Sequence, residues 1–165
     1  MIEKILTKSF IINSLLVFSI FLLDRLSKIY VIYLDKKFLG SEIFSSKFLN
    51  IVLVWNEGIA FGLLSFDQEK LYNFLTFFII LIIFFIFVMI LKSSGLKKLA
   101  LIMILGGALG NVFDRILYKA VPDFIDFHVG NFHWFIFNVS DIFITLGVIG
   151  MVILELIDNS KSNAV

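Results

Sequence analysis

Long apolar segments separated by polar stretches dominate the chain, and they predict helices long enough to cross a membrane. Four such segments are recognised by their runs of Leu, Ile, Val and Phe: residues 10–34, 71–91, 96–117 and 139–157. An α-helix rises about 1.5 Å per residue, so about 20 residues span a hydrocarbon core of about 30 Å. The second segment carries no charged residue, whereas charged residues interrupt the second half of the first.

The pattern therefore predicts a membrane all-α fold with a small β component. We expect a four-transmembrane-helix bundle with two outer segments, residues 35–70 and 118–138. Within the first of these, residues 48–55 are rich in β-branched and aromatic side chains, which favours a strand. In the second, Gly130-Asn131 separates two aromatic-rich pieces and is compatible with a hairpin. The expectation is a short outer β-sheet from the first segment and a second outer loop.

Composition supports a single integral membrane domain over residues 1–165. Hydrophobic residues make up 60% of the chain and its mean hydropathy is +1.03. Soluble domains contain roughly 45–50% apolar residues. The net charge is +1, and no basic patch is interleaved with aromatic residues, so nucleic acid is not an expected partner. The absence of cysteine excludes disulfides, thiol catalysis and thiolate metal sites.

Basic residues predict the orientation of the bundle. Lys92, Lys97 and Lys98 crowd the short link between the second and third helices, and positively charged loops face the cytoplasm. Four spans then place both termini in the cytoplasm, although other basic residues fall in the outer segments. The first helix could be mistaken for a signal peptide. Because no small-residue cleavage site follows it, we expect it to be retained.

Unusual polarity gathers at the outer end of the predicted bundle. The residues are Asp24 and Lys28 in the first helix, Asn111, Asp114 and Arg115 in the third, Asp123 just beyond it, and Asn138 and Asp141 at the start of the fourth. Burying an ionised side chain in a membrane is costly, so such residues indicate a functional site by default. The inner half has no comparable cluster, which predicts a site at the outer interface.

Asp123 and Asp141 are the candidate catalytic pair. Two carboxyl groups that share a buried site cannot both ionise easily, so one becomes an acid beside a base. A water held between them can attack an amide carbonyl while the protonated partner stabilises the developing oxyanion. This chemistry needs no metal. The alternative is structural, with Asp141 capping the fourth helix and Asp123 capping or solvating a loop.

The third helix carries two motifs that have different interpretations. Gly106 and Gly110 are four residues apart, so they share a helix face and are interpreted as packing positions. Asn111, Asp114 and Arg115 share a face one turn further out. These three residues either form a structural hydrogen-bond network or hold the substrate backbone, and both roles are compatible with the spacing.

Two further motifs lie in the first outer segment and in the first helix. Asn56 and Gly58 suit a tight turn, and Asn56 could instead donate to a substrate carbonyl. Asp24 and Lys28 are four residues apart on a helix and can pair with each other. On the sequence alone, the favoured interpretation of this pair is an interfacial ion pair whose lysine snorkels. Attraction of Lys28 to a lipid phosphate is the alternative.

Together these motifs resemble those of bacterial lipoprotein signal peptidase, also called signal peptidase II. Residues 24–28 resemble the first-helix Asp…Lys motif of that family, and residues 56–62 its Asn-x-Gly-x-Ala-Phe motif. Residues 106–115 are similar to its Gly-Asn-x-x-Asp-Arg helix, the most specific piece. Residues 121–125 and 137–141 resemble the two motifs that carry its catalytic aspartates. Five motifs in order make the resemblance strong.

The resemblance implies an aspartic endopeptidase of the bacterial inner membrane. Such an enzyme removes signal peptides from diacylglyceryl-modified prolipoproteins by cleaving on the amino side of the lipid-modified cysteine. Asp123 and Asp141 would be catalytic; Asn56, Gly58, Asn111, Asp114, Arg115 and Asn138 would bind substrate or support the site; Asp24 and Lys28 would be structural or lipid-facing. The implied partners are a lipidated prolipoprotein, membrane lipid and the inhibitor globomycin. No cofactor is implied.

Three positions depart from the family's pattern. Ile59 stands where alanine is usual, Pro122 precedes Asp123, and Ser140 replaces a common alanine before Asp141. Ile59 would narrow a substrate groove, and Pro122 would stiffen the approach to Asp123 by fixing its own φ. None of these changes removes a chemical group that the mechanism needs.

Other classes of function stay open at this point. A small transporter or channel predicts polar residues along a whole helix face, whereas residues 71–91 have few, all near the outer end. A non-catalytic assembly factor would tolerate replacement of the aspartates. A metal-dependent phosphoryl or lipid enzyme is a third alternative. His128 and His133 are expected in a short loop without a third ligand, so we interpret them as interfacial residues and expect no metal site.

Overall fold

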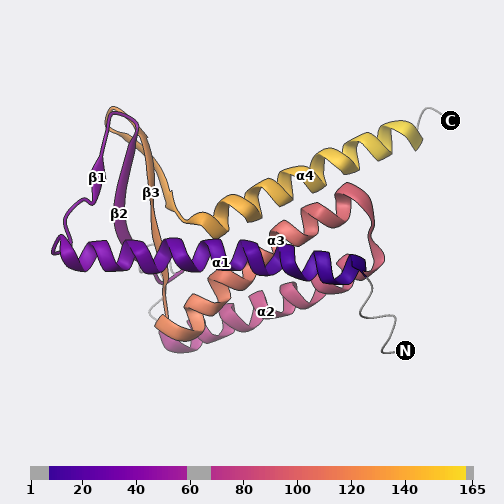
Figure 1. The fold of residues 1–165 in the computed structure, drawn as a ribbon, viewed down its shortest axis with the longest axis horizontal. Helices are drawn as coiled ribbons and strands as arrows, with labels where there is room; N and C mark the ends of the chain where they lie inside the picture. Colours follow the sequence, from indigo (N-terminus) through magenta and orange to yellow (C-terminus); the bar gives the residue numbers. More distant parts are fainter. Residues whose placement is uncertain (1–7, 59–67, 163–165) are drawn as a thin grey trace.

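The computed structural model describes residues 8–58 and 68–162, which form four long helices and a small sheet. In chain order the elements are α1 (Lys8–Lys37), β1 (Phe44–Ser45), β2 (Leu49–Asn56), α2 (Gln68–Lys92), α3 (Gly95–Tyr118), β3 (Val121–Val129), β4 (Phe132–Phe137) and α4 (Val139–Ser162). The sheet stands at one end of the helices, and the link between α2 and α3 lies at the other end (Figure 1). The sheet therefore meets the ends of the helices at one end of the bundle.

Three of the helices are long and apolar enough to cross a membrane, over Tyr72–Lys92, Gly95–Tyr118 and Val139–Ser160. The span in α2 is the most apolar, with a mean hydropathy of 3.4, and little of it is buried inside the protein. Its large side chains, such as Phe77, are exposed and suit contact with lipid. In contrast, α1 buries charged residues in its second half. Length and composition thus support three of the four predicted spans.

The central helix is α3, which packs against α1, α2 and α4. Ile102 of α3 is buried in a hydrophobic core that includes Ile20 of α1. A Cβ added at Gly106 would lie 2.8 Å from the Ile20 side chain, and one added at Gly110 would lie 2.5 Å from the Asp24 carboxylate. Both distances are too short for a real side chain, so the interpretation of these glycines as packing positions is confirmed.

The sheet has four antiparallel strands in the order β1-β2-β3-β4. The strand predicted at residues 48–55 is confirmed as β2. The prediction of a second outer loop is wrong, because residues 121–137 form β3 and β4 of the same sheet. The hairpin at Gly130-Asn131 is confirmed, and Gly130 has the positive φ of 59° that favours glycine. Pro122 is accommodated near the start of β3, where a missing N–H is tolerated.

The register of the sheet brings polar residues of β2 beside those of β3. Asp123 lies opposite Val54, close to Asn56 at the end of β2, and Asp126 lies opposite Asn50. Strand β4 ends at Phe137 and α4 begins at Val139, so a single residue, Asn138, separates them. The two predicted catalytic residues therefore both lie where the sheet joins the helices.

Close approach of α4 to α3 can be tested at two neighbouring glycines. A Cβ added at Gly147 would lie 2.6 Å from the Ala100 carbonyl oxygen, whereas at Gly150 the nearest atom is the Ala100 Cβ at 3.5 Å. We expect Gly147→Ala to lower the free energy of unfolding by about 1–3 kcal/mol because of overpacking. Gly150→Ala should leave it unchanged or raise it, since alanine favours helix. Thermal unfolding in detergent measures both variants. Equal melting temperatures for Gly147→Ala and Gly150→Ala would contradict the close contact of α4 with α3 at Gly147.

Candidate active site

Asp123 lies on β3 and is buried, so it does not occupy a solvated loop. Its Oδ2 accepts a hydrogen bond from Asn56 Nδ2 at 2.9 Å, and its Oδ1 accepts one from Asn138 Nδ2 at 2.6 Å. Burial raises the pKa of the Asp123 carboxyl group, and the two hydrogen bonds only partly offset that effect. The negative charge of Asp141 raises this pKa further. Asp123 therefore holds its proton more tightly than a solvated aspartic acid does.

Asp141 lies in the first turn of α4 and is half-buried. Its Oδ2 accepts a hydrogen bond from the Asn138 backbone N–H at 3.1 Å, while its own backbone N–H donates to Asn138 Oδ1 at 3.2 Å. This reciprocal arrangement is a capping box. Its Oδ1 accepts a further hydrogen bond from Asn111 Nδ2 at 2.8 Å. Asp141 therefore does cap the helix, as the structural alternative predicts, and its carboxylate also belongs to a wider polar network.

Asn138 connects the two aspartates. Its side chain is fully buried, its Nδ2 donates to Asp123, and its Oδ1 accepts from the backbone N–H of Asp141. One amide thus ties a carboxyl group of the sheet to the first turn of α4. The structure brings the predicted pair into a single hydrogen-bonded unit.

A buried ion network between α1 and α3 lies behind this pair. Lys28 Nζ is 3.0 Å from Asp24 Oδ1 and 2.7 Å from Asp114 Oδ2, and Arg25 Nη1 is 2.6 Å from Asp114 Oδ1. Asp24, Lys28 and Asp114 are fully buried. The interpretation of Asp24 and Lys28 as a snorkelling or lipid-facing pair is therefore wrong. Their side chains turn toward α3, where opposite charges compensate the loss of solvation.

Asn111 links this network to the candidate pair. Its Oδ1 accepts a hydrogen bond from Lys28 Nζ at 2.8 Å, and its Nδ2 donates to Asp141 Oδ1 at 2.8 Å. Because lysine is only a donor, it fixes which end of the amide faces each partner. The Asn111 N–H group is thereby directed at the Asp141 carboxylate.

The turn after β2 supports Asp123 from the opposite side. Asn56 Oδ1 accepts a hydrogen bond from the Gly58 backbone N–H at 2.8 Å, and Gly58 has a φ of 74°. This turn leaves the Asn56 Nδ2 group free to donate to Asp123. Arg115 of α3 donates from Nη1 to the Asn111 carbonyl oxygen at 3.2 Å. Ile59, together with the motif through residue 62, lies outside the described residues.

The sequence did not assign two residues that complete the network. Arg25 pairs with both carboxylates of the network and lies 5.1 Å from the centre of the Phe113 ring. Ser140 donates its backbone N–H to Asp24 Oδ1 at 3.0 Å, which joins the start of α4 to α1. Arg25 was detectable as a third charge in the first apolar segment. A backbone donor such as that of Ser140 leaves no signal in a sequence.

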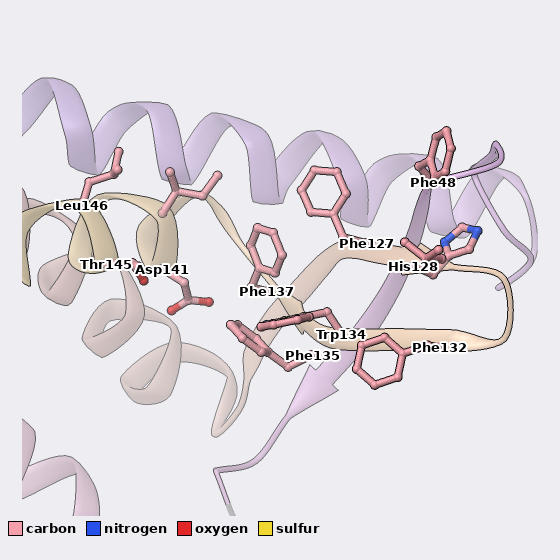
Figure 2. Close-up of a pocket in the computed structure, with 12 residues that line it drawn as sticks. Phe48, Phe127, His128, Phe132, Trp134, Phe135, Phe137, Asp141, Thr145 and Leu146 are labelled. Carbon is pink, nitrogen blue, oxygen red and sulfur yellow. The ribbon is translucent and has the colours of Figure 1, made fainter. Parts of the chain in front are cut away.

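An apolar groove of about 470 Å³ runs along the hairpin to Asp141. Aromatic residues of the sheet and apolar residues of α4 line it, and they include Phe127, Phe132, Trp134, Phe135, Phe137, Ile142 and Leu146. Figure 2 shows Asp141 at the α4 end of this groove and His128 toward the far end. A second hollow of about 440 Å³ borders Asp123, Asn56 and Glu57. The candidate pair therefore lies between an apolar and a more polar opening.

A separate polar cluster lies on the hairpin itself. His128 is on β3 and His133 is on β4, directly opposite each other, so the expectation of a short loop is wrong. Asp126 also lies close enough to serve as a third ligand, contrary to the interpretation that none was available. These three residues could hold a metal ion at a place distinct from Asp123 and Asp141.

Comparison with known proteins identifies the family of this chain. A family model described as signal peptidase (SPase) II matches residues 16–157. The chain belongs to the signal peptidase II family. It is 46% identical over 159 residues to a lipoprotein signal peptidase of Pelagibacter ubique (strain HTCC1062), with 96% of each chain covered. It is 36% identical over 157 residues to a lipoprotein signal peptidase of Anaplasma marginale (strain Florida), covering 94% of this chain and 90% of that protein.

Two solved structures share the fold of this chain. Two structures described as bacterial membrane enzymes, both determined by the in meso method, superpose with TM-scores of 0.67 and 0.69. The first is 28% identical and covers 90% of each chain; the second is 31% identical and covers 87% of this chain and 92% of the other. Membership in the signal peptidase II family implies that the chain is a peptidase of a bacterial membrane.

The buried network makes a direct prediction for stability. Lys28→Met would leave Asp24 and Asp114 with Arg25 as their remaining cation, and we expect it to lower the free energy of unfolding by about 3–5 kcal/mol. Lys37→Met, at the exposed last turn of α1, removes the same charge from the same helix and should have little effect. Thermal unfolding in detergent compares the two variants. A similar melting temperature for both would contradict a compensated buried network.

Proposed function

We propose that the chain is an aspartic endopeptidase that removes signal peptides from diacylglyceryl-modified prolipoproteins. Cleavage falls on the amino side of the lipid-modified cysteine. The observation that carries the proposal is the Asn138 amide, which joins Asp123 and Asp141 in one hydrogen-bonded unit beside an apolar groove. The names of the relatives support the substrate class.

The different surroundings of the two aspartates support an assignment of acid and base. Burial favours the neutral form of Asp123, whereas Asp141 lies at the start of a helix, where the helix dipole favours negative charge. We therefore assign the proton to Asp123 and the charge to Asp141. This arrangement supplies both a general base and a general acid without a cofactor.

The mechanism follows from that assignment. The Asp141 carboxylate takes a proton from a water as the water oxygen attacks the scissile carbonyl carbon. Asp123 donates its proton to the carbonyl oxygen, so the tetrahedral intermediate forms without a free oxyanion. The intermediate collapses when its hydroxyl returns a proton to Asp123 and the C–N bond breaks. As the C–N bond breaks, the proton held by Asp141 passes to the nitrogen of the lipid-modified cysteine, so the leaving group departs as a neutral amine and the starting state is restored.

The supporting residues position this pair and the substrate. Asn56, Asn111 and Asn138 orient the carboxyl groups, and the turn at Gly58 holds the Asn56 amide in place. The guanidinium of Arg115 lies near this turn and supplies donors for substrate carbonyl groups. The ion network of Asp24, Lys28 and Asp114 is structural.

The membrane arrangement completes the proposal. Helix α1 is the fourth span beside the three apolar helices, both termini are cytoplasmic, and the sheet lies at the periplasmic face of the inner membrane. The polar network that α1 buries against α3 removes its charges from lipid. The apolar groove admits the substrate from the lipid side, with its acyl chains remaining in the membrane. Globomycin, as an inhibitor of the family, should compete for this site.

Replacement of either aspartate tests the chemistry. We expect Asp123→Asn and Asp141→Asn each to reduce cleavage of a purified lipidated prolipoprotein by at least about 10²–10⁴-fold, because each removes a proton-transfer group. Glu155→Gln, which removes a carboxylate near the far end of α4, should keep full activity and its inhibition by globomycin. Mass spectrometry of the products measures the rate and locates the cleaved bond. Substantial turnover by either aspartate variant would remove that residue from the mechanism.

The protonation of Asp123 predicts a pH dependence with a definite sign. Since the competent form carries the proton, kcat/KM should fall as pH rises through the raised pKa of Asp123. Asn56→Ala removes a hydrogen bond that lowers this pKa, so the falling limb should move to higher pH even though the rate drops. The pH profiles of the wild-type protein and Asn56→Ala measure the effect. A shift of the limb to lower pH would show that the proton is misassigned.

A further inference from the structure

We propose that Asp126, His128 and His133 form a site for a divalent transition metal, of which Zn²⁺ best fits the ligands. One ligand atom from each of the three residues lies within 4.8 Å of the other two. Imidazole nitrogen and carboxylate oxygen are ordinary Zn²⁺ ligands, and three protein ligands leave a fourth position open. The site is on the hairpin and is distinct from the candidate catalytic pair.

The fold of the hairpin sets the two histidines face to face. His128 on β3 is paired with His133 on β4, and their rings stack with centres 4.9 Å apart and an angle of 20° between planes. Asp126 lies two residues before His128 on the same strand, with an irregular register between them. The sheet therefore holds the Cα atoms of all three residues in place. As a result, less conformational entropy is lost when a metal binds.

An unpaired nitrogen in this cluster points independently to a ligand. His128 Nδ1 is buried, yet it has no hydrogen-bond partner within residues 8–58 and 68–162. A buried nitrogen without a partner costs free energy, and a bound metal ion would remove that cost. His133 is half exposed, so an ion can reach the cluster from solvent.

Hydrogen bonds orient the Asp126 carboxylate, as they orient carboxylates that bind metals. It is buried, and His133 Nδ1 lies 2.8 Å from its Oδ2. Asn50 Nδ2 donates to Oδ2 at 3.3 Å, and Ser45 Oγ donates to Asn50 Oδ1 at 2.8 Å. Such a chain of hydrogen bonds behind a ligand is what orients carboxylates in metal sites. Strands β1 and β2 thus contribute two successive hydrogen bonds behind the Asp126 carboxylate.

Metal binding requires only a small change in this cluster. The ion takes the place of the hydrogen atom between His133 Nδ1 and Asp126, and His133 binds it as a neutral imidazole whose hydrogen is on Nε2. Ligand atoms about 2.0 Å from a tetrahedral Zn²⁺ lie about 3.3 Å apart, so the His133–Asp126 contact must widen slightly while His128 closes in. The bound ion would join β3 to β4 beside the aromatic wall of the groove. It would therefore stiffen the hairpin that carries Phe132 and Trp134.

Zinc titration of the tag-free, detergent-solubilised full chain tests the site directly. The chain has two histidines and no cysteine, so a histidine-dependent site can only be this one. After treatment with a chelator and its removal, calorimetry with Zn²⁺ should give one ion per chain. We expect His128→Gln and His133→Gln each to weaken binding by at least about 100-fold, and Asn50→Ala by about 10–100-fold. Glu155→Gln is the matched carboxylate control and should bind as the wild type does.

Two further measurements separate loss of a ligand from loss of the fold. Melting temperatures recorded without metal should be similar for the wild type and His133→Gln, and added Zn²⁺ should raise only that of the wild type. Co²⁺ in the wild type should give the visible absorption of a tetrahedral complex. Absence of stoichiometric Zn²⁺ binding, or binding that survives both histidine substitutions, would overturn the proposal. Neither outcome would bear on the proposed peptidase chemistry, because zinc binding is measured without substrate and the variants leave Asp123 and Asp141 unchanged.

Discussion

Compensation of buried charge between α1 and α3 is the constraint on which the candidate site depends. Lys28, Asp24 and Asp114 are fully buried, and Arg25 is nearly so. Isolated ions at such positions would each cost several kcal/mol, but two cations facing two carboxylates make the arrangement tolerable. The ammonium group of Lys28 has three hydrogen-bond donors, and the two carboxylates use only two of them. The third donor of Lys28 binds Asn111 Oδ1, so the ion network between the helices also orients an amide of the candidate active site.

Two chains of hydrogen bonds then converge on the aspartates from different elements. One runs from Lys28 through Asn111 to Asp141, and the other from the turn after β2 through Asn56 to Asp123. Asn138 closes the gap between them. The two carboxyl groups consequently have unlike surroundings, one buried on an inner strand of the sheet and one at a helix start. Such unlike surroundings are how a fold separates an acid from a base at one pH.

The sequence predicted the features that repeat along the chain. Long apolar runs located α1, α2, α3 and α4, and the β-branched run at residues 48–55 located β2. The five motifs located Asp123 and Asp141. The β3–β4 hairpin was expected at Gly130-Asn131, but the pairing of β3 with β2 in one sheet was not, because Pro122 and two aspartates break the alternation of apolar and polar positions in β3.

Other features depended on contacts that no local pattern contains. The spacing of Asp24 and Lys28 showed that they share a helix face, but not that α3 would cover that face with Asp114. Asp126 precedes His128 by two residues, which on a strand places them on the same side; the strand had to be recognised first. Asn138 was expected to support the site. Asn138 connects the two aspartates by hydrogen bonds because it is the single residue between β4 and α4.

The most direct test of the central claim is the pKa of Asp123 with and without its neighbour. Carbon-13 NMR of aspartate-labelled protein in detergent can follow the Asp123 carboxyl group, assigned by its loss in Asp123→Asn. If the two side chains share one site, Asp141→Asn removes a negative charge that raises this pKa, and the value should fall. The remote variant Glu155→Gln should leave it unchanged. An Asp123 pKa that is the same in Asp141→Asn and in the wild type would contradict a shared site.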